Sequence, residues 1–479
     1  MKTQRLAAAC ALLLALGLGV TTAPGASADP APAPSASPLT TGPAPSPSTA
    51  SPSPVGPTSS GTPSAKRPAS KPSVSHDPSP PPRGKTFANR QELRQWFEER
   101  GCTLPEDTGG RIVGCFWETG AEPAASRAAD AAWPDCPAPS HKDKIYYVRK
   151  YSCSHVNQIG TFVKADSTPE IIGVANTDSA FEERLDSASR EWKRTVYFRT
   201  NYVTGELVES MLTATFSIDC GGTCGTPVPK TFIAQKGVVQ QHDHFMESAG
   251  SSITFPQPQT KIKFAYPGAV IEGSEGNSTH LGPPTGVRCD SLTDAVSTGK
   301  PGCVYYWYTP TYEVKYGAGA PMPTIAENIL FAQLALRSRP GFPGTGSIPG
   351  GQPLVRGPAK IADPKDGVLK DFDELSRRVS CPGSIPRPTG QTCDEYPFAS
   401  TWQGAEWVPG DQWSCRFVPK AEQDYQGADI RKFHDDNRLW RNPTGKVTDT
   451  TGRPQGAYWV WVSNAPTTPP SFTQCQNHM

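Results

Sequence analysis

The chain has 479 residues, and its 46 Lys and Arg side chains almost balance its 45 Asp and Glu side chains. A net charge this small excludes a strongly basic protein that attracts nucleic acid over a long range, so any contact with nucleic acid needs a local patch. Hydrophobic residues make up 36% of the sequence, and the length allows about two or three domains with sizeable cores.

The first residues have the features of a secretory signal peptide. Lys2 and Arg5 form a positive n-region, residues 7–20 are apolar, and the small residues 26–28 offer a cleavage site. The apolar run is shorter than the roughly 18 residues that a membrane-spanning helix needs. We therefore expect residues 1–28 to be removed and the mature chain to be secreted, extracellular and without a membrane anchor.

Cys10 raises the alternative of a lipid anchor, because the residues before it resemble a lipoprotein box. Such a box follows the apolar run, whereas Cys10 lies near its start, so we favour the signal peptide. Residues 29–85 are almost wholly Pro, Ser, Ala, Thr and Gly, which predicts a disordered linker. A semi-rigid linker of this kind suits a protein whose folded part is held away from a cell wall.

The loss of Cys10 with the signal peptide leaves twelve of the 13 cysteines. An even number of cysteines in an exported chain favours disulfide bonds over free thiols. A thiolate metal site at Cys220 and Cys224 is the alternative that we do not favour, because no second close pair of cysteines accompanies them. Six disulfides are therefore expected, with a connectivity that the sequence leaves open.

The predicted elements change in character along the chain. Residues 91–97 carry apolar side chains at helical spacing and predict a short helix within a Cys-containing, otherwise irregular segment, 86–140. A β-rich domain of unknown role follows at 141–320. Its short runs of β-branched and aromatic residues, separated by Gly, Pro and Asn, indicate a sandwich. The predicted strands are 145–148, 195–198, 212–216, 262–266 and 304–308.

Residues 321–380 predict a helical connector between the β-rich domain and the last segment. Thr324 is the expected N-cap of its first helix, and Glu327, three residues later, is the expected partner in a capping box. Repeated Gly and Pro at 341–351 then break the chain, and a second helix is expected at 369–379.

The last segment, 381–479, contains the residues that indicate chemistry. Asp394 and Glu395 are adjacent carboxylates beside aromatic residues and a Pro, and burying both charges without partners is too costly. At least one carboxylate therefore needs a cation, a water molecule or a metal ion. Around them we expect a strand at 414–418, a turn at 422–427, a polar helix from about 428 to 439 and a closing strand at 457–462.

The order of these residues resembles the NucA/NucB family of extracellular deoxyribonucleases. The resemblance rests on the segment 393–400, on Gln403-Gly404-Ala405, on Val418-Pro419 leading into 422–427, on Asn437-Arg438-Leu439 and on the closing aromatic strand. It covers about the last fifth of the chain, with weaker similarity back to Pro321-Met322-Pro323. It implies an α+β fold with a small C-terminal nuclease domain similar to a ββα-metal core, preceded by the mainly β, sandwich-like domain and the linker. It also suggests a protein of actinobacterial type.

The resemblance implies roles for four of these side chains. Phosphodiester hydrolysis needs a base for water and a cation that neutralises the phosphate and the departing 3′ oxygen. Asp394 would be the general base or its close partner, and Glu395 would be an orienting carboxylate. Arg416 or Arg438 would hold the phosphate through paired hydrogen bonds.

The resemblance also implies a divalent metal ion, Mg²⁺ or Mn²⁺, because the implied ligands are rich in oxygen. Glu422 would be the metal-binding acid, supported by Gln423, Gln426 and Asn437. The family usually has Asn at the position of Gln423, whose side chain is longer by one methylene group. If that Asn binds the metal directly, Gln423 alters the geometry and can weaken or abolish activity.

Three histidines invite a metal interpretation that we do not favour. His434 is a lone histidine on the polar helix, where a surface or capping position is more common than a place in a site. His242 and His244 would share one face of a strand, but no third ligand is evident, and zinc sites normally have three or four.

Two main hypotheses about function follow. The first is a secreted endonuclease that cleaves extracellular DNA through contacts to its phosphate backbone and therefore without sequence specificity. The alternative is a non-catalytic cell-surface or extracellular binding protein with a degenerate nuclease domain, in which the β-rich domain recognises an unknown ligand or a cell-wall partner. A third hypothesis is a toxin whose C-terminal domain is delivered into competing cells.

Overall fold

The computed structural model describes residues 84–106, 111–119, 133–134, 136, 145–250, 253–272, 286–292, 296, 299–446 and 456–475. The predicted signal peptide and nearly all of the predicted linker lie outside these residues. Within the described part of the chain, no helix has the length and apolar character needed to cross a membrane. The described elements are mixed α and β, with many strands and four α-helices.

The main sheet of the β-rich region contains seven described strands, in the order β10-β1-β3-β4-β5-β8 with β2 paired to β3. Adjacent strands within this sheet run antiparallel, except that β1 and β10 run parallel. The predicted strands 145–148 and 195–198 are parts of this sheet. The strands are β1 (Ile112–Glu118), β2 (Ile145–Val148), β3 (Tyr151–Lys164), β4 (Glu170–Arg184), β5 (Glu191–Gly205), β8 (Val239–Glu247) and β10 (Ala269–Glu272).

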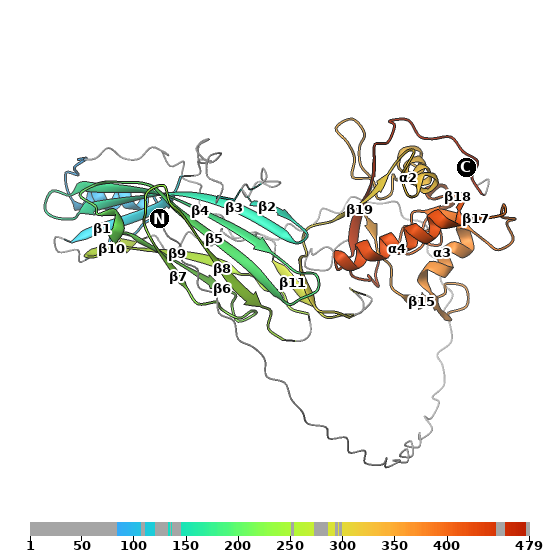
Figure 1. The fold of residues 1–479 in the computed structure, drawn as a ribbon, viewed down its shortest axis with the longest axis horizontal. Coiled ribbons are helices and arrows are strands. Elements are labelled where there is room, and N and C mark those ends of the chain that lie inside the picture. The colour runs from blue at the N-terminus through green and yellow to red at the C-terminus, as the bar shows by residue number, and fades with distance from the viewer. Residues whose placement is uncertain are drawn as a thin grey trace, which may run out of the picture. The chain divides into compact units, whose positions relative to one another are not determined.

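A second, smaller sheet lies against the main sheet, with the order β7-β6-β9 (Figure 1). Aromatic side chains fill the space between the two sheets. Phe116 stacks on Phe264 with ring centroids 3.8 Å apart, and Phe198 stacks on Phe232 at 5.9 Å. This packing forms the sandwich-like, β-rich region expected from the runs of β-branched and aromatic residues. The strands are β6 (Thr213–Asp219), β7 (Lys230–Ile233) and β9 (Gln259–Ala265), and a 3-10 turn (Glu209–Met211) precedes β6.

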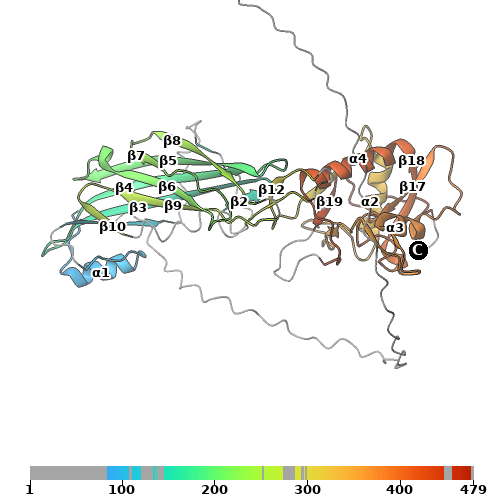
Figure 2. The same cartoon turned by 90° about the horizontal axis from the view of Figure 1, so that it is seen from below.

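The helix α1 (Arg90–Glu98) covers the outer face of the main sheet (Figure 2). Because side chains alternate along β1, Phe116 points between the sheets while Trp117 points outward. Leu93, Trp96 and Phe97 of α1 pack in the same cluster as Trp117. The helical spacing read from residues 91–97 is therefore confirmed.

The remaining strands include a short hairpin and three small sheets nearer the C-terminus. β13 runs parallel to β19, and β14 runs antiparallel to β19. This pairing joins residues from both sides of the predicted domain boundary at 320. The strands are β11 (Val287–Asp290), β12 (Gly302–Tyr305), β13 (Thr311–Lys315), β14 (Leu354–Val355), β15 (Lys360–Ala362), β16 (Leu369–Asp371), β17 (Gln391–Tyr396), β18 (Ser414–Pro419) and β19 (Ala457–Ser463).

The three C-terminal helices differ from the predicted boundaries. α2 (Pro323–Ala335) begins after Met322, whose side chain makes no capping bond, so the predicted capping box of Thr324 and Glu327 is wrong. α3 (Phe372–Ser380) begins three residues later than expected, because 369–371 form β16. α4 (Lys420–Asp436) includes the segment 422–427, which we had expected to form a turn. A 3-10 turn (Gly410–Gln412) precedes β18.

The twelve described cysteines are joined in six disulfides. Cys220 pairs with Cys224, which removes the thiolate metal alternative at this pair. Two disulfides link β17 and β18 to other parts of the C-terminal region, Cys381–Cys393 through β17 and Cys415–Cys475 through β18. The pairs are Cys102–Cys115, Cys136–Cys153, Cys220–Cys224, Cys289–Cys303, Cys381–Cys393 and Cys415–Cys475.

Arg438, two residues beyond the end of α4, is fully buried against the β-rich region. Its guanidinium forms an ion pair with the equally buried Asp290. The same group donates to the backbone oxygen of Asp290 at 2.8 Å, of Ser187 at 2.8 Å and of Lys300 at 3.0 Å. Arg438 therefore anchors the C-terminal end of α4 to the strands and turns of the β-rich region.

Replacing Arg438 by Leu leaves the buried carboxylate of Asp290 with only one of its two arginine partners, Arg288, and breaking a buried ion pair costs about 3–5 kcal/mol. We expect Arg438→Leu to lower the free energy of unfolding by that order, measured by urea denaturation. Arg431→Leu on the exposed face of α4 is the matched control, and it should change stability by less than about 0.5 kcal/mol. Equal effects of the two substitutions would contradict this role.

Candidate active site

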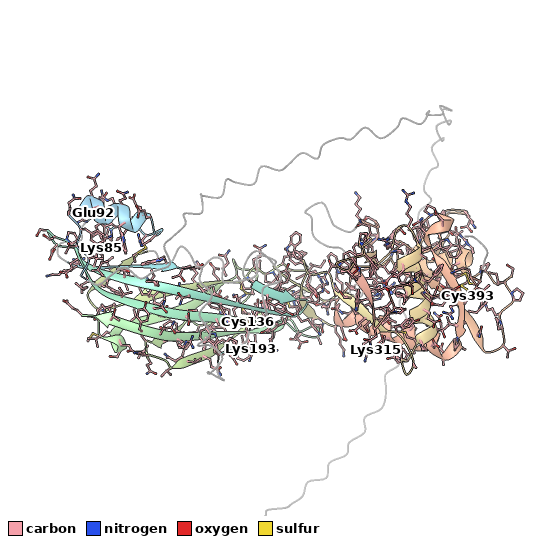
Figure 3. The ribbon with its side chains drawn as sticks, turned by 90° about the horizontal axis from the view of Figure 1, so that it is seen from above. Lys85, Glu92, Cys136, Lys193, Lys315 and Cys393 are labelled. Atoms are coloured by element: carbon pink, nitrogen blue, oxygen red, sulfur yellow. A yellow bond between two sulfur atoms is a disulfide. The ribbon has the colours of Figure 1, made fainter. Side chains whose placement is uncertain are left out.

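The candidate site lies on the hairpin of β17 and β18, where Asp394 is paired in register with Arg416. α4 follows β18 directly, and α2 packs against both strands (Figure 1). Cys393, the neighbour of Asp394, marks this hairpin in Figure 3. Because side chains alternate along a strand, Asp394 points toward α2 and α4 while Glu395 points to the opposite face, toward α3.

Asp394 is buried, with 2% of its surface exposed. The amide of Asn328 on α2 donates to Asp394 Oδ2 at 2.9 Å. Burial raises the pKa of the Asp394 carboxyl to about 7, although hydrogen bonds from Asn328 and Gln423 oppose that rise. The nearby carboxylate of Glu422 raises this pKa further. Asp394 is therefore an acid whose protonation changes near neutral pH, as a general base requires.

Glu395 is also buried, and burial raises its pKa to about 8. Arg377 on α3 lies with its Nε 3.5 Å from Glu395 Oε1 and lowers the pKa of both acids. The Arg377 side chain is 56% exposed. A guanidinium in contact with solvent thus lies beside Glu395, on the face of the hairpin opposite to Asp394.

Glu422, on the first turn of α4, is held by the N-terminus of α2. Its carboxylate accepts hydrogen bonds from the backbone N of Thr324 at 2.9 Å, from Thr324 Oγ1 at 3.0 Å and from the backbone N of Ile325 at 3.2 Å. The same carboxylate is close enough to Asp394 to influence its pKa. The structure therefore brings the predicted base and the predicted metal-binding acid together.

Two amides next to Glu422 have polar atoms without a partner. Gln423 donates weakly to Gln426 Oε1 at 3.4 Å. The Oε1 atom of Gln423 and the Nε2 atom of Gln426 are buried without a hydrogen bond among the described residues. Buried polar groups normally have partners, so an orphaned amide oxygen beside two carboxylates fits a hard divalent cation.

Asn437 and Arg438 are not brought to this site, which corrects two predicted roles. Glu422 lies in the first turn of α4 and Asn437 lies at its far end, 15 residues and about 22 Å away along the axis. One metal ion cannot contact both. Arg438 is fully buried in its ion pair with Asp290, so it cannot reach a DNA phosphate.

Arg416 lies on the hairpin but is partly committed to other groups. It forms an ion pair with Glu327 of α2 and lies 4.4 Å from the ring centroid of Phe472. Its side chain is 19% exposed. Arg416 is therefore near Asp394, yet it is more enclosed than Arg377.

The three histidines lie away from the acids. His434 is buried 5.2 Å from the ring of Tyr458, so the expected surface or capping position is wrong. Burial lowers its pKa. The ring centroids of His242 and His244 are 4.8 Å apart on β8, so the two side chains share one face of the strand as predicted. In the described part of the chain, the two clusters of three or more potential metal-binding side chains consist mainly of disulfide cysteines and include neither of these histidines.

Sequence reasoning missed Asn328, Arg377 and Ser414. Asn328 is fully buried, and it links Asp394 to Ser414, whose hydroxyl donates to Asn328 Oδ1 at 2.8 Å. A single amide within the mainly apolar segment 325–332 was a usable signal, because a buried amide needs specific partners. Arg377 had no comparable signal, since its neighbour Arg378 has the same charge.

The hairpin therefore holds two buried acids with raised pKa values, and comparison with known proteins gives the family that this region resembles. Residues 375–447 match the family model described as deoxyribonuclease NucA/NucB. The matched region contains Arg377, Asp394 and Glu422, so the C-terminal region carries a NucA/NucB domain, as the motif had suggested. No curated protein and no solved structure matches the chain.

The raised pKa values predict how stability depends on pH in the metal-free protein. Unfolded Asp and Glu release their protons near pH 4, whereas folded Asp394 and Glu395 hold theirs to about 7 and about 8. Between these limits the folded state binds more protons, so the stabilisation present below about pH 4 is lost as pH rises toward 8.

Urea denaturation in EDTA at pH 5 and pH 8 measures this effect. We expect the free energy of unfolding to fall more steeply with pH in the wild type than in the variant Asp394→Asn/Glu395→Gln. The same pH dependence in both proteins would show that these acids titrate normally.

Proposed function

We propose that the protein is a secreted, metal-dependent endonuclease that hydrolyses the phosphodiester bonds of extracellular DNA without sequence specificity. The observation that carries this proposal is the buried Asp394 beside Glu422, inside the region matched by the nuclease family. The order β17, β18, α4, two strands followed by a helix, supports the proposal of a ββα-metal core. Secretion rests on the predicted signal peptide, and the six disulfides are consistent with an oxidising compartment.

The proposed metal site consists of Glu422 with Gln423 and Gln426, next to Asp394. These side chains offer carboxylate and amide oxygens, which suit Mg²⁺ or Mn²⁺. When bound, such an ion neutralises charge on the phosphate and on the departing 3′ oxygen. Gln423 replaces the usual family Asn, and the orphaned state of its Oε1 is compatible with a ligand role.

The protein side chains supply proton transfer and orientation. Asp394 accepts the proton of the attacking water, and its pKa near 7 matches that task at neutral pH. Asn328 holds one oxygen of this carboxylate, and the amide of Gln423 also hydrogen-bonds to the carboxylate. Glu395 lies on the opposite face of the hairpin with Arg377 beside it, and we assign it an orienting role.

We propose two arginines as contacts to the DNA phosphates. Arg416 was already suggested by the sequence, and Arg377 is added because of its place beside Glu395 in the structure. Arg377 is the more exposed of the two, so DNA reaches it without rearrangement of the core. Contacts to phosphate carry no base information, which fits cleavage without sequence preference. An Arg377→Gln variant with an unchanged KM for DNA would exclude this contact.

A binding protein with a degenerate nuclease domain is the second candidate, and the specific observation in its favour is Gln423. A longer amide at this position shifts the metal geometry if the family Asn is a direct ligand. In that case the β-rich region would bind the unknown ligand or cell-wall partner. The toxin hypothesis adds delivery to another cell to the same nuclease chemistry.

Plasmid cleavage by the purified chain tests the proposal. We expect degradation with Mg²⁺ or Mn²⁺ and none with EDTA. Asp394→Asn removes the base, so kcat should fall by about 10²–10⁴-fold while the melting temperature changes little.

Asp411→Asn, on the exposed turn before β18, is the control and should keep wild-type activity. Full activity of Asp394→Asn would remove Asp394 as the base. Absence of cleavage with every metal tested would move the binding protein to first place.

A further inference from the structure

Helix α2 lies outside the matched residues 375–447, yet it contacts three side chains of the candidate site. Its N-terminus binds Glu422, its Asn328 binds Asp394, and its Glu327 pairs with Arg416. The same helix is part of the main hydrophobic core of the C-terminal region, through Ile325 and Ile329. A rigid, well-packed element therefore carries the groups that bind the acids.

The contact with Glu422 satisfies the open end of α2. The first N–H groups of a helix have no partner within the helix, and this end favours negative charge. Met322 provides no side-chain cap, and the carboxylate of Glu422, which lies 98 residues beyond Thr324, accepts the hydrogen bonds instead. Three donors hold both of its oxygens, so the direction of the remaining lone pairs is fixed.

The contact with Asp394 lies one turn further along α2. Thr324 and Asn328 are four residues apart, so they project from the same face of the helix. Ser414 donates to Asn328 Oδ1, and this bond leaves the NH₂ group of Asn328 directed at Asp394. The amide has no exposed surface, so solvent does not compete for it.

We propose that Thr324 and Asn328 are positioning residues of the nuclease site, a role that rests on the proposed function. Thr324 and the N-terminus of α2 orient Glu422 for the metal ion, and Asn328 orients Asp394 for water. The functional nuclease unit therefore includes α2, although the family match begins only at residue 375.

Two substitutions test the two contacts separately. Thr324→Val keeps the shape but removes the hydroxyl donor, so Mn²⁺ affinity, followed by electron paramagnetic resonance, should weaken by about tenfold. Thr324→Ser restores the donor and should restore the affinity. Asn328→Leu should lower kcat by about 10–100-fold while leaving KM for DNA unchanged, because DNA does not touch this buried residue.

Gln333→Met is the matched control, since Gln333 is a buried amide on the same helix that bonds to the backbone of Val460. It should lower the melting temperature without changing Mn²⁺ affinity or kcat. Wild-type Mn²⁺ affinity in Thr324→Val together with wild-type kcat in Asn328→Leu would overturn the proposal. Losses of the same size in Gln333→Met would also overturn it, because they would show a general packing effect.

The Mn²⁺ measurement separates this proposal from the proposed function. If the wild type cleaves DNA and binds Mn²⁺ but the α2 variants match it, only the positioning role fails. If the wild type neither cleaves DNA nor binds Mn²⁺, the proposed function fails, and the positioning role fails with it.

Discussion

The burial of Asp394 beside Glu422 is the constraint on which the rest of the C-terminal region depends. Two carboxylates that lose water cost free energy unless donors replace it. The donors come from α2, where Asn328 binds Asp394 and the first turn binds Glu422. These bonds compensate only in part for the lost hydration, and the pKa of Asp394 therefore stays near 7. A shifted pKa of this kind is characteristic of sites that bind a cation or transfer a proton.

Helix α4 connects this site to the β-rich region. Its N-terminal turn carries Glu422, and its C-terminal end is bound by arginines. Arg149 donates to the backbone oxygen of Asn437 at 2.8 Å, where the helix dipole favours a positive charge. Arg438 follows the same helix end and forms an ion pair with Asp290 of β11. The β-rich region therefore helps to fix the helix that carries the proposed metal-binding acid, in addition to any ligand that it binds.

The sequence predicted elements whose signal is local. The helix at 91–97 and the strands at 145–148 and 457–462 are present, because helical spacing in the first and the local β-branched and aromatic content in the other two are properties of neighbouring residues. Long-range contacts produced the errors. The true cap of α2 is Glu422, far along the chain, and the buried state of Arg438 depends on Asp290. The acidic motif was recognisable from the order of its residues. The separation of Glu422 and Asn437 became evident only when the structure showed that one continuous helix, α4, lies between them.

The central claim is that Glu422 and its neighbouring amides hold one divalent ion beside Asp394. Anomalous diffraction from crystals of the full chain soaked in Mn²⁺ tests this claim most directly. We expect one peak in contact with Glu422 and with an amide oxygen of Gln423 or Gln426, close to Asp394. A peak at His242 and His244, or no peak at Mn²⁺ concentrations that support cleavage, would contradict it.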